Sequence, residues 1–276
     1  MKKFNLHEHQ GPLIMGILNV TPDSFSDGGQ FNSVGAAVKQ AQRMLMEGAD
    51  IIDIGGESTR PGAPEVSESE ELDRVLPVIE ILKRELGCAI SLDTSKAAVM
   101  KAGIEAGVDL INDVCALSQP SALEVVAASH VPVCLMHMQG TPRTMQDNPQ
   151  YSDIIEVLKE FFEQKISLCE NAGLEKSRIW LDPGFGFGKS LHHNYELLNR
   201  MDELNHFGLP ILAGISRKSM LGNLLNLPAD QRGLSSVIAA TLAMTRGAKI
   251  LRVHDVAETK QAVTLFNATQ YGVINE

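Results

Sequence analysis

The sequence is poor in aromatic residues and cysteine, and it has no long apolar run. Aromatic residues make up 5% of the 276 positions, so the core must be aliphatic, and a hydrophobic fraction of 44% is enough to build it. No run of about 18 apolar residues occurs, which argues against a membrane span. The first residues do not form a signal-peptide core either, so we expect a cytoplasmic protein.

The cysteines are too scattered to suggest a disulfide framework or a zinc site. Cys88, Cys115, Cys134 and Cys169 stand singly in apolar segments without a CxxC pair. Single cysteines of this kind are typical of buried thiols in a reducing compartment.

Positive charge is also in deficit. The chain has 24 Lys and Arg against 34 Asp and Glu, a net charge of −10. Nucleic acids and anionic membranes are bound through clustered Lys and Arg, so we expect neither as a partner. A small anion is compatible with this balance, because screening over roughly 8–10 Å lets a local basic cluster outweigh distant carboxylates.

Short apolar segments alternate with longer segments of helical spacing along the whole chain. Strands are expected at 13–18, 51–54, 89–92, 110–111, 131–136, 179–181, 210–215 and 250–253. Helices are expected at 34–45, 72–82, 96–106, 121–128, 151–172, 193–207, 234–246 and 256–269. Aliphatic strands that are each followed by a helix, with no break in composition, predict one (β/α)8 TIM barrel domain over residues 1–276 rather than a doubly wound sheet.

Polar residues follow almost every expected strand. They are Asn19, Asp53, Glu57, Asp93, Asn112, Asp113, His137, Asp182, Ser216, Lys218, Arg252 and His254. Barrel enzymes carry their chemistry at this end of the strands, so these residues predict a polar pocket. Asp and Asn can instead cap the next helix, an alternative that applies to Asp93, Asn112, Asp113 and His137. Lys218, Arg252 and His254 are poor N-caps, which favours a functional reading.

Three loops at the same face have distinctive compositions. Residues 19–29 and 55–64 are rich in Gly, Pro, Ser and Asp, which is typical of turns. They could be ordinary connections, but their position favours lids over a substrate. Residues 182–190 resemble a phosphate-binding loop, yet that motif needs glycine where Pro183 stands. We expect instead a turn that leaves Asp182 facing the pocket while Phe187 offers a ring edge to a ligand.

Two of these segments carry a family resemblance. NVTPDSFSDGG at 19–29, preceded by MGIL at 15–18, and DIGGESTRPG at 53–62 resemble the two signatures of the dihydropteroate synthase family. The similarity continues through 93–96, 111–113, 135–140, 182–189, 216–219 and 252–255. It implies a barrel enzyme that condenses 6-hydroxymethyl-7,8-dihydropterin diphosphate with 4-aminobenzoate, giving dihydropteroate for folate synthesis.

The resemblance also implies roles for single residues. Asp182 would accept the donor pair of the pterin ring, Asp93 and Asn112 would bond the other heteroatoms, and Lys218 would bind the carbonyl and N5 side. Arg252 would stack on the ring and, with His254 and Asn19, face the diphosphate. Asp93, Lys218, Arg252 and His254 are the expected catalytic residues. Phe25, Thr59, Pro61, Phe187 and Ser219 are candidates for the aminobenzoate pocket, and Arg60 is a further substrate-binding candidate.

Loss of diphosphate, rather than activation of the arylamine, is the expected chemical problem. Mg²⁺ held through Asn19 and phosphate oxygens would stabilise the departing charge together with Arg252 and His254. The family resemblance further implies a homodimer packed through late helices.

Two other interpretations stay open. A pterin-binding methyltransferase domain would share the barrel and the pterin contacts, but it needs no diphosphate clamp of the kind that Asn19, Thr59 and Arg60 suggest. A non-catalytic pterin-binding paralogue would keep the pocket and lose turnover, which the intact loop signatures disfavour.

Overall fold

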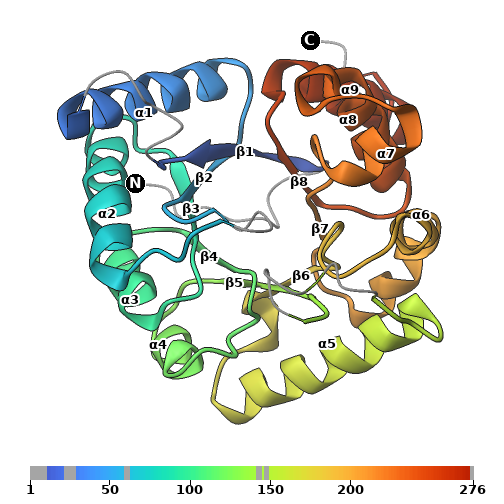
Figure 1. The fold of residues 1–276 in the computed structure, drawn as a ribbon, viewed down its shortest axis with the longest axis horizontal. Coiled ribbons are helices and arrows are strands. Elements are labelled where there is room, and N and C mark those ends of the chain that lie inside the picture. Colours follow the sequence, from blue (N-terminus) through green and yellow to red (C-terminus); the bar gives the residue numbers. More distant parts are fainter. Residues whose placement is uncertain (1–10, 22–28, 59–62, 141–144, 146–148, 274–276) are drawn as a thin grey trace.

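Eight parallel strands form the centre of the computed structural model, which describes residues 11–21, 29–58, 63–140, 145 and 149–273, with the backbone alone for 29–33. The strands are β1 (Leu13–Asn19), β2 (Ile51–Gly55), β3 (Ala89–Asp93), β4 (Leu110–Asp113), β5 (Val133–Met136), β6 (Ile179–Asp182), β7 (Leu212–Ala213) and β8 (Ile250–Val253). They pair in the order β6-β5-β4-β3-β2-β1-β8-β7, and a parallel bridge between Leu181 and Ile211 joins the two end strands. Figure 1 looks along this barrel and places the helices in a ring around it. The expected (β/α)8 fold is confirmed.

Helices follow every strand. They are α1 (Gly29–Met46), α2 (Glu68–Glu85), α3 (Ala97–Glu105), α4 (Ala122–Ala127), α5 (Ile154–Asn171), α6 (Leu191–Arg200), α7 (Ser219–Leu225), α8 (Gly233–Thr245) and α9 (Val256–Tyr271). The described residues also form the 3-10 helices η3 (Lys176–Arg178), η4 (Met201–Phe207) and η5 (Ala229–Gln231). Local signals fix some of these boundaries: Ser67 begins α2 with a capping box to Glu70, and Asp153 accepts the backbone N–H groups of Ile155 and Glu156 at the start of α5.

Two features differ from the sequence-based expectation. The strand expected at 210–215 is reduced to the two residues of β7 and the bridging residue Ile211, and the separate helix α7 follows it. Asn226 ends α7 in the left-handed conformation, with φ 54°. A helix of seven residues is shorter than the window in which helical periodicity can be recognised. The helix expected at 193–207 also changes to a 3-10 helix after Arg200.

The inward faces of the strands change from apolar to polar along the barrel axis. The buried apolar cluster inside the barrel contains Leu13, Met15, Ile51, Leu110, Cys134, Trp180, Leu212 and Ile250. Two residues further along the strands, Ile51 is followed by Asp53, Leu110 by Asn112, Trp180 by Asp182 and Ile250 by Arg252. Side chains two apart lie on the same face of a strand. The barrel therefore has an apolar base and a polar mouth at the carboxyl ends of its strands.

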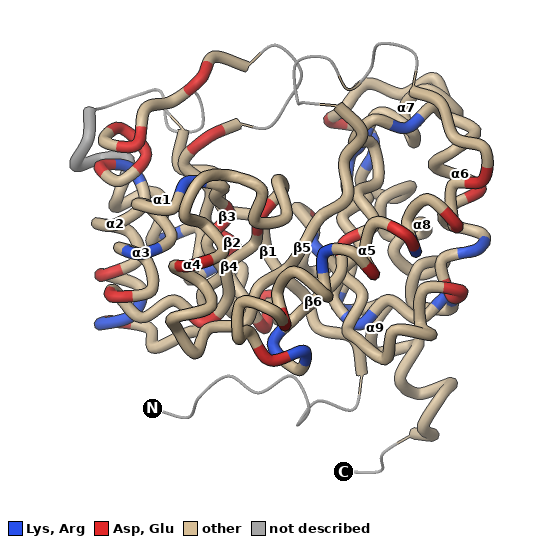
Figure 2. The backbone as a smooth tube through the Cα atoms, turned by 90° about the horizontal axis from the view of Figure 1, so that it is seen from below, with Lys and Arg blue, Asp and Glu red and all other residues tan. Residues whose placement is uncertain are grey.

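Charged residues on the outside are mixed in sign. Figure 2 shows Lys and Arg interspersed with Asp and Glu along the surrounding helices. Within the described ranges, no helix combines the length and the apolar character needed to cross a membrane.

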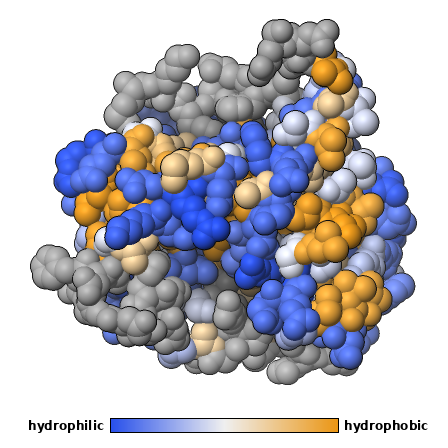
Figure 3. Space-filling model, turned by 90° about the horizontal axis from the view of Figure 1, so that it is seen from above, coloured by the Kyte–Doolittle hydropathy of each residue, from blue (hydrophilic) through white to orange (hydrophobic). Residues whose placement is uncertain are grey.

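One outer face is apolar. Leu234, Ile238 and Leu242 on α8 and Leu265 on α9 have between 50% and 76% of their surface exposed. Figure 3 shows apolar side chains gathered on the right-hand side, where Figure 1 places α7, α8 and α9. A groove of about 840 Å³ lies between α8 and α9 and includes Leu234, Leu265 and Phe266. Such a surface is typical of an interaction face.

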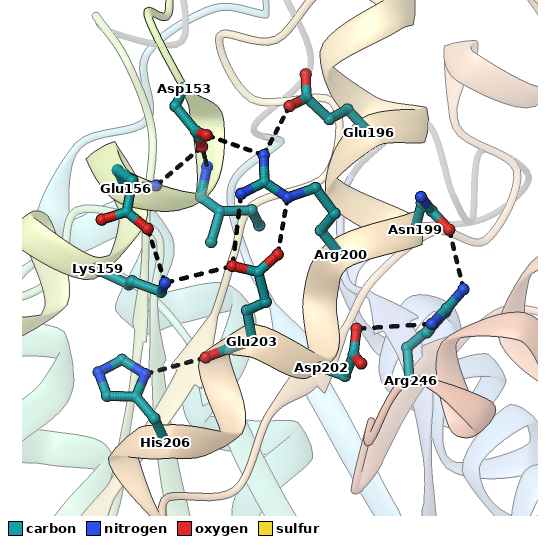
Figure 4. A network of polar contacts seen from close by, with 11 residues as sticks. Asp153, Glu156, Lys159, Glu196, Asn199, Arg200, Asp202, Glu203, His206 and Arg246 are labelled. Carbon is teal, nitrogen blue, oxygen red and sulfur yellow. Dashed lines mark hydrogen bonds and ion pairs between the residues drawn. The ribbon is translucent and has the colours of Figure 1, made fainter.

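A network of exposed charges links the helices on another side (Figure 4). Arg200 of α6 bonds Asp153 at the start of α5, Glu196 one turn earlier and Glu203 of η4. Arg246, which follows α8, contacts Asn199 and Asp202. Exposed ion pairs contribute roughly 0–1 kcal/mol each, so this network orients neighbouring helices more than it stabilises the fold.

Candidate active site

Arg252 at the end of β8 is held between two carboxylates. Its Nε donates to Asp53 Oδ2 at 2.6 Å and its Nη2 to Asp93 Oδ2, also at 2.6 Å. Asn112 Nδ2 lies 3.5 Å from the other oxygen of Asp53. Asp53 is completely buried, and Arg252 keeps 21% of its side chain exposed. The guanidinium is therefore fixed in orientation while part of it faces the mouth of the barrel.

Asp53 and Asp93 share one guanidinium, so a single positive charge lies between two carboxyl groups. Burial raises the pKa of Asp93 to about 7, because the opposing attraction of Arg252 is offset by repulsion from Asp53. Burial alone would lower the pKa of Arg252. The attraction of Asp53 and Asp93 outweighs this effect and raises the pKa of the guanidinium above its ordinary value.

A second pair of opposite charges, Asp182 and Lys218, faces the same mouth. Burial raises the pKa of Asp182 and lowers that of Lys218 to about 8, while each is opposed by the charge of the other. Asp182 Oδ1 accepts the backbone N–H of Gly184 at 2.7 Å. Lys218 Nζ donates to the carbonyl of Phe185 and lies 4.5 Å above the centre of the Phe187 ring.

Lys218 and His254 are placed by a strained turn. Arg217 adopts a left-handed conformation with φ 56° and is held there by hydrogen bonds from its guanidinium to Asp255 at 2.5 and 3.1 Å. Ser216, just before this turn, accepts the backbone N–H of His254 at 3.1 Å, and its Oγ lies 3.0 Å from the ring atom Nδ1. The imidazole of His254 is thus oriented by Ser216 at the end of β8.

Asn19 at the end of β1 and Asp93 at the end of β3 lie on either side of Gly55 of β2. A first side-chain carbon at this glycine would be in ordinary van der Waals contact, 3.7 Å from Asn19 Oδ1 and 3.7 Å from Asp93 Oδ2. These are hard oxygen donors of the kind that Mg²⁺ accepts. In the described part of the chain, no three His, Cys, Asp or Glu side chains form a group that could hold a metal alone. A magnesium ion here would need oxygen ligands from a substrate as well.

An ion triad anchors the segment that follows β2. Lys96 bridges Glu57, after the strand, and the buried Glu71 of α2. Glu57 also accepts the backbone N–H of Val66 at 3.1 Å, which ties together the two described ends of the loop. The candidates Thr59, Arg60 and Pro61, like Phe25, lie outside the described residues.

Comparison with known proteins identifies the family. Residues 15–254 match the model of the pterin binding enzymes. The dihydropteroate synthase of Haemophilus influenzae is 54% identical over 258 residues, which cover 94% of both chains. Two solved structures are also similar. The Yersinia pestis dihydropteroate synthase in a sulfonamide drug complex superposes with a TM-score of 0.91 at 55% identity, covering 97% of this chain and 96% of the other.

The second is the dihydropteroate synthase from Xanthomonas albilineans in complex with 7,8-dihydropteroate, with a TM-score of 0.87, 46% identity, and 97% and 96% coverage. The chain belongs to the dihydropteroate synthases of the pterin-binding enzyme family. It is therefore a transferase, and the interpretations as a methyltransferase or a non-catalytic paralogue are set aside.

Within this dihydropteroate synthase fold, most of the candidate residues that are described lie together. Asp93, Asn112 and Arg252 are joined through Asp53, and Lys218 interacts electrostatically with Asp182, Arg252 and Asp93. Phe187 covers Lys218, while Asn19 ends β1 and His254 directly follows β8. Ser219 is the exposed first residue of α7, next to Lys218. Their individual roles stay predictions.

The helix-cap alternative fails for Asp93 and Asn112, since Lys96 and Ser121 occupy the N-cap positions of α3 and α4. Asp113 is structural in a different way: it accepts the N–H groups of Cys115 and Leu117 within a tight turn.

Sequence reasoning gave no role to two buried residues that now stand out. Asp53 was one of the strand-end residues, but its bond to Arg252 spans 199 positions and no local pattern reveals it. Lys189 belonged to the rejected phosphate-binding motif and to the segment 182–189 that resembles the family, but it was given no role of its own. It is 3% exposed, and its Nζ lies among backbone carbonyls and His137.

The pKa of Asp93 gives a prediction for the dihydropteroate synthase barrel without ligands. Its folded value of about 7 lies above an unfolded value of about 3.9, so the unfolded chain releases this proton first as the pH rises. The stabilisation present at low pH should therefore be lost between about pH 4 and pH 7. Urea unfolding of Asp93→Asn and of the parent protein, compared from about pH 5 to pH 8, should show the variant gaining relative stability up to about pH 7. Parallel profiles would contradict this assignment.

Proposed function

We propose that this enzyme condenses 6-hydroxymethyl-7,8-dihydropterin diphosphate with 4-aminobenzoate to give 7,8-dihydropteroate and diphosphate. The observation that carries the proposal is the mixed polar mouth of the barrel, where Asp93, Asn112 and Asp182 lie with Lys218 and Arg252. The Xanthomonas albilineans relative in complex with 7,8-dihydropteroate supports the same chemistry by similarity.

The pterin ring is recognised through its hydrogen-bonding edges. Asp182 accepts the adjacent N–H and amino donors, since its bond from Gly184 uses only one of the several lone pairs of a carboxylate. Asn112 and Asp93 bond the remaining heteroatoms, and Lys218 donates to the carbonyl and N5 side. A buried carboxylate left without donors is costly, so analogues that lack them bind roughly 10⁴-fold more weakly.

The reaction depends on expulsion of diphosphate. The arylamine is neutral near pH 7 and has a free lone pair, so no Ser-His-Asp triad is needed. Arg252 has five N–H donors. Its bonds to Asp53 and Asp93 use Nε and Nη2, and we assign the N–H groups of Nη1 to the diphosphate. His254 and Asn19 face the diphosphate beside it. The C–O bond to diphosphate breaks with its electron pair going to the diphosphate, and the exocyclic carbon becomes cationic. The lone pair of the amine then forms the C–N bond and the nitrogen releases one proton, while water is excluded from the carbon.

Asn19 is the residue that would hold Mg²⁺ at the mouth. Its carboxamide oxygen would supply one hard ligand, and substrate phosphate oxygens would supply others. The ion, when bound, would neutralise part of the charge on the leaving diphosphate.

The aminobenzoate pocket is assigned to Phe187 and Ser219 together with Phe25, Thr59 and Pro61, and Arg60 belongs with the substrate-binding residues. Phe187 offers an aromatic face beside Lys218. We place the enzyme in the cytoplasm, in agreement with four free cysteines that form no disulfide.

We infer that the enzyme is a homodimer packed through α8 and α9. The exposed leucines of both helices and the groove between them form an apolar face of the kind that obligate dimers bury.

Turnover by the purified protein tests the reaction itself. Diphosphate should be released with both substrates present, and Asp182→Asn should weaken pterin binding by about 10²-fold, because charged hydrogen bonds contribute roughly 1.5–3 kcal/mol each. Calorimetry with the pterin measures the binding, and Asp230→Asn on the exposed turn η5 is the control. Unchanged pterin affinity in Asp182→Asn would remove it from the ring contacts.

Magnesium is tested by titration. Chelation should slow diphosphate release with an unchanged Tm, and Asn19→Ala should raise the Mg²⁺ concentration needed for half the maximal rate by about 10-fold or more. A rate that does not depend on metal would refute the role of Asn19.

The dimer is tested by light scattering. Leu234→Glu with Leu265→Glu should convert the assembly to single chains, because charges on an apolar interface are left without partners when it closes. Met46→Glu, at a residue of α1 that is 83% exposed, is the matched control. A parent protein that scatters as single chains would contradict the proposal.

A further inference from the structure

Lys189 is the last residue of the glycine-rich segment 184–189, and its ammonium group points back toward the backbone of that segment. Nζ donates to the carbonyl oxygens of Gly184 at 2.9 Å and Phe187 at 3.1 Å. It also lies 3.0 Å from His137 Nδ1 and 3.4 Å from the His137 carbonyl oxygen. A side chain that is 3% exposed and surrounded by four acceptors is fixed in one position.

The carbonyls converge because of three glycines. Gly184, Gly186 and Gly188 have φ values of 71°, 80° and 61°, which other residues rarely adopt. A side-chain carbon on Gly184 would lie 1.9 Å from the carbonyl oxygen of His137, and one on Gly188 would lie 2.4 Å from that of Gln139. The segment is therefore wedged against the chain after β5. Carbonyl oxygens that point at one centre repel each other unless a cation lies between them.

The same segment contacts both sides of the pterin site. The N–H of Gly184 bonds Asp182, the carbonyl of Phe185 accepts from Lys218, and the ring of Phe187 lies under the Lys218 ammonium. We propose that Lys189 is a positioning residue that holds residues 184–187 in the shape that orients Asp182 and Lys218 toward the pterin. This inference rests on the proposed function, which assigns the pterin contacts to those two residues.

The electrostatics fit a role inside the loop rather than at the substrate. Burial lowers the pKa of Lys189 to about 7, with Asp182 opposing this change and Lys218 adding to it. Burial and the charge of Lys189 also hold the pKa of His137 far below its ordinary value, so the imidazole is neutral and can accept from the ammonium. The pKa of His193 on α6 is lowered mainly by burial, and the positive charges of His192 and Lys189 add to this effect.

The test is a pair of substitutions with chemical rescue. Lys189→Ala removes three carbons and the ammonium, while Lys189→Met fills the space without charge. Both should weaken binding of 6-hydroxymethylpterin, measured by calorimetry, by about 10- to 100-fold, the cost expected when charged hydrogen bonds are lost. The KM for 4-aminobenzoate should rise as well, because Phe187, whose carbonyl accepts from Lys189, belongs to the proposed aminobenzoate pocket. Lys101→Ala, at an exposed lysine of α3, is the matched control.

Added n-propylammonium, which matches the deleted atoms, should restore pterin affinity in Lys189→Ala but not in Lys189→Met, and sodium chloride at equal ionic strength should restore neither. Wild-type affinity in both variants would overturn the inference. Loss of affinity that propylammonium does not restore in Lys189→Ala, or loss of the folded barrel in both variants, would overturn it too, because a general structural role would then be sufficient. Failure of the parent protein to bind the pterin would instead count against the proposed function.

Discussion

The bonds of Arg252 to Asp53 and Asp93 are the interaction on which the barrel mouth depends. Removing one partner of a buried ion pair leaves an uncompensated charge and typically costs about 3–5 kcal/mol. The guanidinium joins β8 to β2 and β3, strands that are not its neighbours in the sheet, so it fixes the mouth across the barrel. Because the bonds involve one edge of the guanidinium, the same contacts that hold Arg252 leave another edge for a ligand. Stability and substrate binding thus rest on one side chain.

Alternation along the strands explains why these residues meet. Each strand places every second side chain inside the barrel, and the inside is apolar near the base, where Trp180 and Leu110 pack. The next inward residues on the same two strands are Asp182 and Asn112, so the polar groups are concentrated in one layer. That layer loses apolar packing, and it keeps its shape through buried hydrogen bonds and ion pairs instead. The apolar base and the helices around the barrel supply the stability that such a layer requires.

The sequence predicted which residues stand at the strand ends, but it did not predict which of those residues bond to one another. Periodicity located all eight strands, and the residues at their ends included Asp53, Asp93 and Arg252. It missed α7, because its seven residues are too few for a periodic signal, and it overextended β7. Lys189 had no assigned role, because the surrounding carbonyls converge only when three glycines take left-handed conformations. Partners that lie far apart in the chain, such as Asp53 and Arg252, follow from closure of the barrel and not from any local pattern.

The charge balance at the mouth bears on how an anionic substrate is accepted. Asp53, Asp93 and Asp182 are set against Arg252, Lys218 and Lys189, three carboxyl groups with three cations. Burial lowers the pKa of both lysines toward neutrality, so their protonation depends on nearby charge. Lys189 is already bonded to the carbonyls of Gly184 and Phe187, so its charge is used within the fold. Lys218 and the exposed part of Arg252 are the cations of this set that remain to meet an anionic substrate in the proposed reaction.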